Sequence, residues 1–214
     1  MTLLCIETSA DPSVIGLVAD GKLLKETLLA DRDLLPVAVS ELLSACDKQS
    51  GDINAIAIGI GPGSFTGLRV GLAYAKGMAR ALSIPLWPVS SLQIFAANLR
   101  GQYDSIIAFS PARRGQAHVQ KFNGADLSEA TELTVLEYES IRAILTENTA
   151  LVGPAVTKLD AKLQTDYKEY IARESDAHRA HSLLLAELAT QQWSHTEPPA
   201  AGDLVPVYGL EFGK

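Results

Sequence analysis

Two short stretches of the chain carry residue types that could bind an anion or a metal. Residues 7–9 end an apolar segment with a carboxylate and two hydroxyls, and residues 61–71 form a glycine-rich stretch after a second apolar segment. Glycine permits close backbone approach, and the first amides of a helix attract phosphate. The candidate phosphate ligands are Glu7, Thr8, Ser9, Gly61, Gly63 and Ser64.

The spacing of the glycine-rich stretch matches neither of the common phosphate-binding motifs. A P-loop that begins at Gly61 would require glycine and lysine where Thr66 and Gly67 stand. The dinucleotide fingerprint fails as well, because Gly67 lies one residue too far along the chain to be its third glycine. Spacing alone therefore favours a structural turn here, with a phosphate site as the alternative. For residues 7–9 the competing interpretation is capping of a turn.

Other arrangements that would indicate catalysis are weak or missing. His178 and His181 are three residues apart on a helical pattern, but no third metal ligand is evident, so solvent-exposed helix residues are the favoured interpretation. Gly61-Pro62-Gly63-Ser64 is not a nucleophile elbow. We therefore predict no metal site and no catalytic residue.

The elements that must position these residues alternate between strands and helices. Alternating apolar residues between turn residues predict strands, and apolar residues at helical spacing predict helices. The predicted strands are 3–9, 13–19, 23–30, 55–60, 84–89, 105–110, 116–122 and 150–152, with a short extended segment over 204–208. The predicted helices are 33–47, 66–82, 90–99, 137–145 and 177–193.

Two of the predicted helices, 33–47 and 66–82, are more apolar than a surface helix requires. In the second of them Gly71 and Gly77 interrupt the helix, at a cost of about 1 kcal/mol each relative to alanine. Such glycines indicate close approach to a neighbouring strand or helix. Full burial and contact with another chain both explain these helices.

Composition limits the classes of function. A formal net charge of −7 provides no basic face for binding nucleic acid alone, so a role on RNA would need a partner. Cys5 and Cys46 lie in apolar segments and are expected to be buried thiols. Neither a cleavable leader nor an apolar span of membrane length is recognisable, so we expect a cytoplasmic protein without a membrane association.

Residues 4–9 and, above all, residues 60–71 resemble the bacterial TsaB family, also called YeaZ. The similarity extends through the segment 85–90 and is looser afterwards. It implies an α/β fold of the actin-like, sugar-kinase and heat-shock-protein (ASKHA) type, with two related lobes that each contain a mixed sheet. We expect a first lobe over 1–102, a second over 103–202, and a tail over 203–214 that returns to the first lobe.

The resemblance also implies a function. TsaB-like proteins are noncatalytic partners and activators of TsaD in the complex that installs threonylcarbamoyl on adenosine beside the anticodon of tRNA. The expected partners are TsaD as a heterodimer, the ATPase TsaE and, indirectly, tRNA, with a homodimer when isolated. No cofactor is expected on this chain alone, although ATP or ADP at the complex interface fits the family. The alternative is an ASKHA-type ATP-binding kinase or carbamoyltransferase that acts on its own.

In this family the two apolar helices of the first lobe pair with the equivalent helices of TsaD. We therefore expect side chains from both helices to bind the partner. They are Leu35, Val39, Leu42, Leu72, Tyr74, Lys76 and Arg80. The chain departs from the family pattern at Pro111-Ala112-Arg113, where an aspartate is usual, and after Tyr208, where Gly209-Leu210 replaces Leu-Arg.

Overall fold

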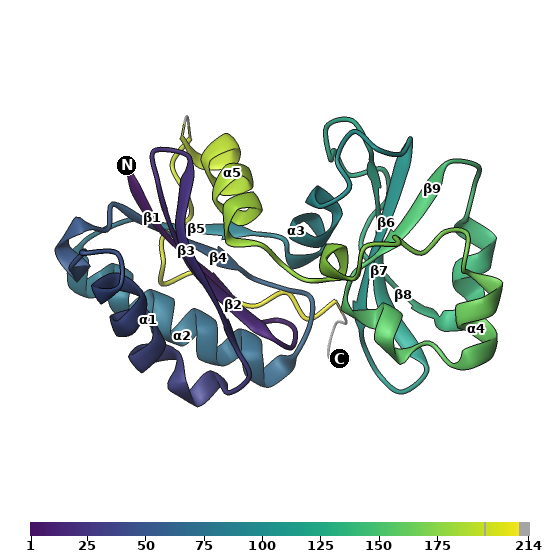
Figure 1. The fold of residues 1–214 in the computed structure, drawn as a ribbon, viewed down its shortest axis with the longest axis horizontal. Helices are drawn as coiled ribbons and strands as arrows, with labels where there is room; N and C mark the ends of the chain where they lie inside the picture. Colours follow the sequence, from purple (N-terminus) through teal and green to yellow (C-terminus); the bar gives the residue numbers. More distant parts are fainter. Residues whose placement is uncertain (195, 210–214) are drawn as a thin grey trace. The chain divides into compact units, whose positions relative to one another are not determined.

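The computed structural model describes residues 1–194 and 196–209, which form two compact units, each with its own sheet (Figure 1). The first unit comprises Met1–Ile94 and Ala180–Val207. The second comprises Phe95–Arg179 together with the last described residues, Tyr208 and Gly209.

The first unit contains a mixed five-stranded sheet in the order β3-β2-β1-β4-β5. The antiparallel pairs are β1–β2 and β2–β3, and the parallel pairs are β1–β4 and β4–β5. Its strands are β1 (Thr2–Glu7), β2 (Ser13–Ala19), β3 (Lys22–Leu29), β4 (Ala55–Gly59) and β5 (Leu86–Val89).

Helices cover both faces of this sheet. Figure 1 shows α1 (Leu35–Ser44) and α2 (Phe65–Leu82) on one face and α5 (Ser182–Trp193) on the other. All residues of β1 and β4 are consequently buried, which explains why residues 3–6 and 55–58 are continuously apolar rather than alternating. The short helix α3 (Ser91–Ala97) follows β5.

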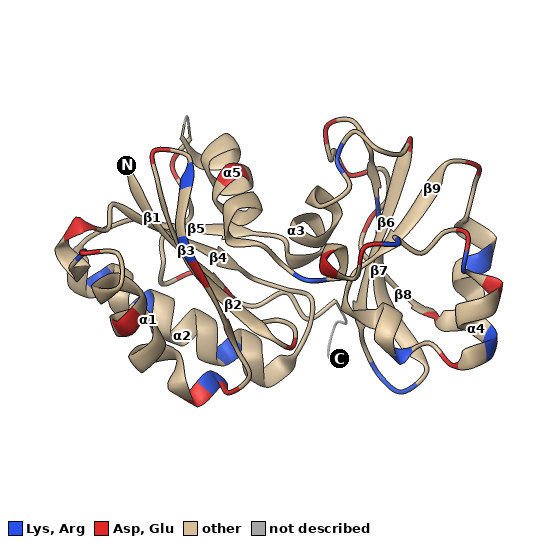
Figure 2. Ribbon diagram, viewed as in Figure 1, with Lys and Arg blue, Asp and Glu red and all other residues tan. Residues whose placement is uncertain are grey.

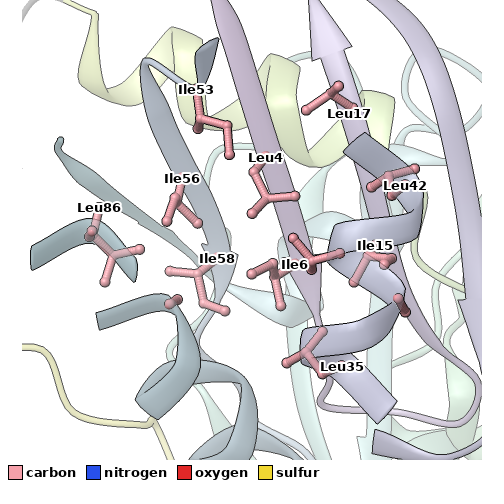
Figure 3. Packing of buried hydrophobic residues seen from close by; sticks show 14 of the residues in the cluster. Leu4, Ile6, Ile15, Leu17, Leu35, Leu42, Ile53, Ile56, Ile58 and Leu86 are labelled. Carbon is pink, nitrogen blue, oxygen red and sulfur yellow. The ribbon is translucent and has the colours of Figure 1, made fainter. Parts of the chain in front are cut away.

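The core of the first unit lies between the sheet and the α1–α2 layer. Alternate residues of the central strands point toward the helices, because successive side chains of a strand lie on opposite faces. Figure 3 shows this packing for Leu4, Ile6, Ile15, Leu17, Leu35, Leu42, Ile53, Ile56, Ile58 and Leu86.

The second unit repeats the strand connections of the first. Its four-stranded sheet has the order β8-β7-β6-β9, in which β6–β7 and β7–β8 are antiparallel and β6–β9 is parallel. The strands β3-β2-β1-β4 of the first unit have the same order, with two antiparallel pairs followed by one parallel pair. The predicted fold class, two related α/β lobes each with a mixed sheet, is therefore confirmed. The strands are β6 (Ser105–Pro111), β7 (Gln116–Asn123), β8 (Thr134–Glu137) and β9 (Thr149–Val152).

Helical segments of the second unit are short. The one α-helix that lies wholly within its described residues is α4 (Ala161–Asp166), and the others are the 3-10 segments η3 (Tyr138–Ile144), η4 (Pro154–Lys158) and η5 (Ser175–His178). The helix predicted over 137–145 is a 3-10 helix that begins one residue later, because Glu137 ends β8. The first unit contains two further 3-10 segments, η1 (Arg32–Leu34) and η2 (Ser50–Asp52).

The helix predicted over 177–193 begins only at Ser182. Arg179 and His181 are extended, with φ values of −108° and −128°. The Glu26 carboxylate accepts a hydrogen bond from the Ser182 N–H at 2.6 Å. A carboxylate at a helix start satisfies a free amide and complements the helix dipole, which accounts for the late beginning.

The lobes are also divided differently from the expectation. Residues 95–102 belong to the second unit, and residues 180–202 belong to the first. The reason is that α5 buries Leu185 and Leu188 on the first sheet, and the Trp193 indole N–H donates to the Pro88 carbonyl at 2.9 Å. Within the returning segment, Leu204 joins the first core.

Candidate functional site

The residues that end β1 are enclosed by the first unit. Glu7, Thr8 and Ser9 are all buried. One carboxylate oxygen of Glu7 accepts from the Ser9 N–H at 2.6 Å, and the other accepts from the Ser91 hydroxyl at 2.8 Å. Burial raises the pKa of the Glu7 carboxyl, and the hydrogen bonds from Ser9 and Ser91 partly oppose this shift. The carboxylate therefore faces neighbouring protein groups rather than solvent.

The glycines of the central stretch allow α2 to lie against the end of β1. A Cβ atom on Gly63, Gly67 or Gly71 would lie 2.5 Å from the Ser9 carbonyl oxygen, 2.0 Å from the Thr8 carbonyl oxygen and 2.1 Å from Thr8 Oγ1, respectively. The Thr8 hydroxyl donates to the Gly67 carbonyl at 2.8 Å. Gly67 and Gly71 are four residues apart in α2 and so share one helix face, whereas Gly63 precedes the helix. The prediction of close packing holds for Gly71, but Gly77 has open space around it.

Three amides of this turn are engaged within the chain. Gly61 N–H donates to Ser91 Oγ at 2.9 Å, Ser64 N–H to the Ser9 carbonyl at 2.7 Å, and Gly67 N–H to Ser64 Oγ at 3.2 Å. Gly61 has a φ of 102°, a left-handed conformation that favours glycine. The arrangement supports the structural interpretation of this turn over the phosphate site.

The Arg32 side chain lies against the turn that follows β1. Its guanidinium donates to the carbonyl oxygens of Thr8 and Ala10 at 3.3 and 3.0 Å and pairs with the carboxylate of Asp11. The cation nearest to the proposed phosphate ligands is therefore committed to protein groups. Sequence reasoning missed this residue because nothing in its local pattern links it to the end of β1.

Four of the residues predicted to bind a partner are core residues instead. The side chains of Leu35, Val39, Leu42 and Leu72 are at most 5% exposed and pack in the first core. The helical stripe that holds them faces the sheet, so their side chains pack mainly within the first unit. Sequence periodicity identified the stripe but could not decide which of its two explanations applies.

The other three predicted partner-binding residues lie outside that stripe. Tyr74 and Lys76 are half-buried and Arg80 is exposed. Burial raises the pKa of the Tyr74 hydroxyl. Lys76 Nζ donates to the Gly202 carbonyl at 3.1 Å, so this side chain is already held by the returning segment.

Large apolar side chains that sequence reasoning did not select are exposed near the starts of α1 and α2. Leu34 is 53%, Val37 55% and Phe65 44% exposed. The Arg69 guanidinium lies 3.8 Å from the centre of the Phe65 ring, a cation–π contact. The apolar strip containing Leu34 was visible in the sequence, whereas Phe65 was hidden in the glycine-rich stretch.

A groove of about 290 Å³ lies between the same two helices. Tyr74 and Met78 of α2 form one side, and α1 with the residues after it forms the other. The full lining is Pro36, Val39, Ser40, Leu43, Ser44, Lys48, Gln49, Ser50, Tyr74 and Met78.

The two paired histidines do not form a metal site. His178 belongs to the second unit and His181 to the first. His178 is hydrogen-bonded to backbone groups, and His181 Nδ1 lies 3.9 Å from the Glu26 carboxylate. Over residues 1–194 and 196–209, no three His, Cys, Asp or Glu side chains come together in a way that could hold a metal ion.

Acidic and basic residues are interspersed over both units (Figure 2). None of the helices in the described part of the chain is both long and apolar enough to cross a bilayer.

The chain departs from the TsaB pattern at residues 111–113 and after Tyr208. Pro111 ends β6, and Tyr208 lies in the second unit, whereas Leu210 lies outside the described residues.

Comparison with known proteins identifies the family to which the chain belongs. The model of the family described as "TsaD: tRNA N6-adenosine threonylcarbamoyltransferase" matches residues 30–197. This is well over half of the chain, and together with the two-lobed α/β fold it defines the class. The chain belongs to this threonylcarbamoyltransferase family.

Its relatives include proteins named TsaB. A protein named "tRNA threonylcarbamoyladenosine biosynthesis protein TsaB" from Bacillus subtilis is 39% identical over 123 residues, 55% of this chain and 53% of that protein. The chain thus matches about half the length of that relative. A protein of the same name from Haemophilus influenzae is 25% identical over 97% of this chain and 93% of its own length.

A solved structure extends the similarity to the whole fold. The structure of YeaZ from Pseudomonas aeruginosa superimposes with a TM-score of 0.75 at 25% identity, covering 97% of this chain and 99% of that one. The resemblance to the TsaB (YeaZ) family is confirmed.

Proposed function

We propose that this chain acts in the biosynthesis of threonylcarbamoyladenosine in tRNA, as a noncatalytic partner that activates TsaD. Similarity to proteins named for this pathway, over nearly the whole chain in one case, supports the pathway assignment. The sealed turn between β1 and α2 is the observation that carries the noncatalytic role. In the described residues the Glu7 carboxylate and the Thr8 hydroxyl are bonded to neighbouring protein groups, and the Ser9 hydroxyl is buried without a hydrogen-bond partner, so this chain offers no open phosphate cradle there.

The proposal also covers nucleotide and tRNA binding, the further partner TsaE and the cellular location. Because the amides of Gly61, Ser64 and Gly67 are engaged, no nucleotide binds this chain alone, and ATP or ADP would bind only where TsaD completes a site. With a net charge of −7, the chain meets tRNA indirectly through the complex. TsaE is a further member of this assembly, which we place in the cytoplasm.

We propose the exposed α1–α2 face as the surface that binds TsaD. It combines Leu34, Val37 and Phe65 with Arg80, and the groove between the helices can receive side chains of a partner helix. Exposed apolar side chains that lie near a groove mark interaction surfaces more often than single scattered ones do. The same face would mediate a homodimer when TsaD is absent.

Mixing the purified chain with TsaD and separating the products by size exclusion tests this surface. We expect Val37→Glu and Leu34→Glu to abolish the complex while the isolated variants stay folded. The matched control is Leu24→Glu on edge strand β3, where the side chain is 44% exposed and α1–α2 is untouched. An intact complex with Val37→Glu and Leu34→Glu combined would exclude this face.

Calorimetry of the isolated chain with ATP and Mg²⁺ tests the cofactor proposal. We expect no saturable heat in the absence of TsaD. Tight binding accompanied by turnover would instead support the alternative of an ATP-dependent enzyme that acts on its own.

A further inference from the structure

The outer edge of β9 in the second unit is covered by a short extended segment, residues 170–172. Leu151 of β9 forms a parallel bridge with Ile171. The Leu151 N–H donates to the Tyr170 carbonyl at 2.7 Å, and the Ala172 N–H donates to the Leu151 carbonyl at 3.0 Å. Two ladder bonds thus attach the segment to the sheet. A third point of attachment comes from His178.

The His178 ring joins this segment to the residue after β9. Nδ1 lies 3.3 Å from the Gly153 amide nitrogen, and Nε2 lies 3.0 Å from the Ala172 carbonyl oxygen. An amide N–H can only donate and a carbonyl oxygen can only accept. Both contacts are therefore satisfied by a single form of the ring, the neutral tautomer with its proton on Nε2. Protonation of Nδ1 would place two donors against each other at Gly153.

The groups around the ring do not stabilise its cation strongly. Burial lowers the pKa of His178, while the hydrogen bond to Ala172 and the charge of Glu174 act in the opposite direction. On η5 itself, Asp176 pairs with Arg179. Residues 150–157, which include the end of β9 and the first turn of η4, contain no charged side chain. Glu174 is thus the charge that favours the imidazolium, and burial outweighs it.

We propose that His178 is a pH-sensitive latch that ties residues 170–172 to Gly153 at the end of β9 when neutral and loses its bond to Gly153 when protonated. The consequence reaches a groove of about 730 Å³, because Ile171, Ala172 and Arg173 form one of its walls. Val156, Thr157 and Gln164 contribute to the remaining lining. Acidification would therefore loosen this wall of the groove.

The direction of the pH effect follows from the sign of the pKa shift. The pKa of His178 in the folded chain is lower than its ordinary value of 6.5, so the folded chain binds this proton less tightly than the unfolded chain does. The neutral His178 ring stabilises the latch fully above pH 6.5, and this stabilisation is lost as the pH falls through the pKa of the folded chain.

NMR of the full-length chain tests the latch directly. Long-range ¹⁵N–¹H spectra should show the Nε2–H tautomer of His178 at pH 7.5, with a titration midpoint below 6.5. Hydrogen exchange at the Gly153 and Ala172 amides, corrected for the intrinsic pH effect, should accelerate about three- to tenfold as His178 titrates, as expected for loss of one hydrogen bond.

Two variants separate the latch from a general effect of acid. His178→Gln retains a donor and an acceptor but cannot be protonated, so the accelerated exchange should disappear. His181→Gln, three residues further on, should retain it. An Nδ1–H tautomer, or exchange that does not follow His178 ionisation in the unaltered chain, would overturn the proposal, as would the same acceleration in His178→Gln.

Discussion

Gly67 and Gly77 lie on the same helix, but their surroundings differ completely. A Cβ on Gly67 would lie 2.0 Å from the Thr8 carbonyl oxygen, whereas one on Gly77 would meet nothing within 4 Å. We expect Gly67→Ala to lower the free energy of unfolding by about 1–3 kcal/mol through overpacking against backbone. Gly77→Ala should raise it by up to about 1 kcal/mol, because alanine favours helix. Urea denaturation of both variants measures the difference, and equal effects would contradict the close approach of α2 to β1.

The Glu7 carboxyl makes the stability of the folded chain depend on pH in the direction opposite to that of most acidic residues. Its folded pKa is raised above the ordinary value of 4.5, so the folded chain binds this proton more tightly than the unfolded chain does. The wild-type stability should therefore fall as the pH rises from 4.5 through the folded pKa, by about 1.4 kcal/mol for each unit of the shift.

Glu7→Gln isolates this contribution. The amide can accept from the Ser9 N–H and donate to Ser91 Oγ without burying a charge. We expect the variant to be at least as stable as the wild type at pH 7.5, and its advantage to shrink at acidic pH. Denaturation curves between pH 5 and 8 test this. A difference in stability that does not change with pH would show that Glu7 has no raised pKa.

At the scale of elements, α1 has one face in the core and one in solvent. Leu42 is 1% exposed, so Leu42→Ala should lower the free energy of unfolding by about 2–5 kcal/mol. Val37 is 55% exposed, and Val37→Ala should change it by less than about 0.5 kcal/mol. Thermal denaturation distinguishes the two faces. A small effect of Leu42→Ala would reopen its earlier assignment to the partner surface.

Local patterns predicted the elements of the first unit well. The periodicity of residues 33–47 and 66–82 led to α1 and α2, and alternation led to β1–β3. The start of α5 was not predictable, because it depends on a bond from Ser182 to Glu26, which is distant in sequence. The same limit applies to the candidate site. The Thr8–Gly67 and Glu7–Ser91 contacts join residues that no local pattern connects.

At the scale of the molecule, the chain is two copies of one strand arrangement, with the first copy completed from the far end of the sequence. The sheet orders β3-β2-β1-β4 and β8-β7-β6-β9 correspond strand by strand. Residues 180–207 supply α5 and a further core residue, Leu204, to the first unit. The α1–α2 face is opposite to the face that α5 covers, so it stays available for a partner (Figure 1).

The most direct test of the proposed function is reconstitution of tRNA modification. TsaD and TsaE without their own TsaB would be combined with this chain, unmodified tRNA, ATP and threonylcarbamoyl-adenylate, and the nucleosides analysed by mass spectrometry. We predict that threonylcarbamoyladenosine appears only when TsaD and this chain are both present, and that Val37→Glu prevents it while Leu24→Glu does not. Absence of the modified nucleoside with the unaltered chain, or its formation by this chain without TsaD, would contradict the assignment as a noncatalytic activator.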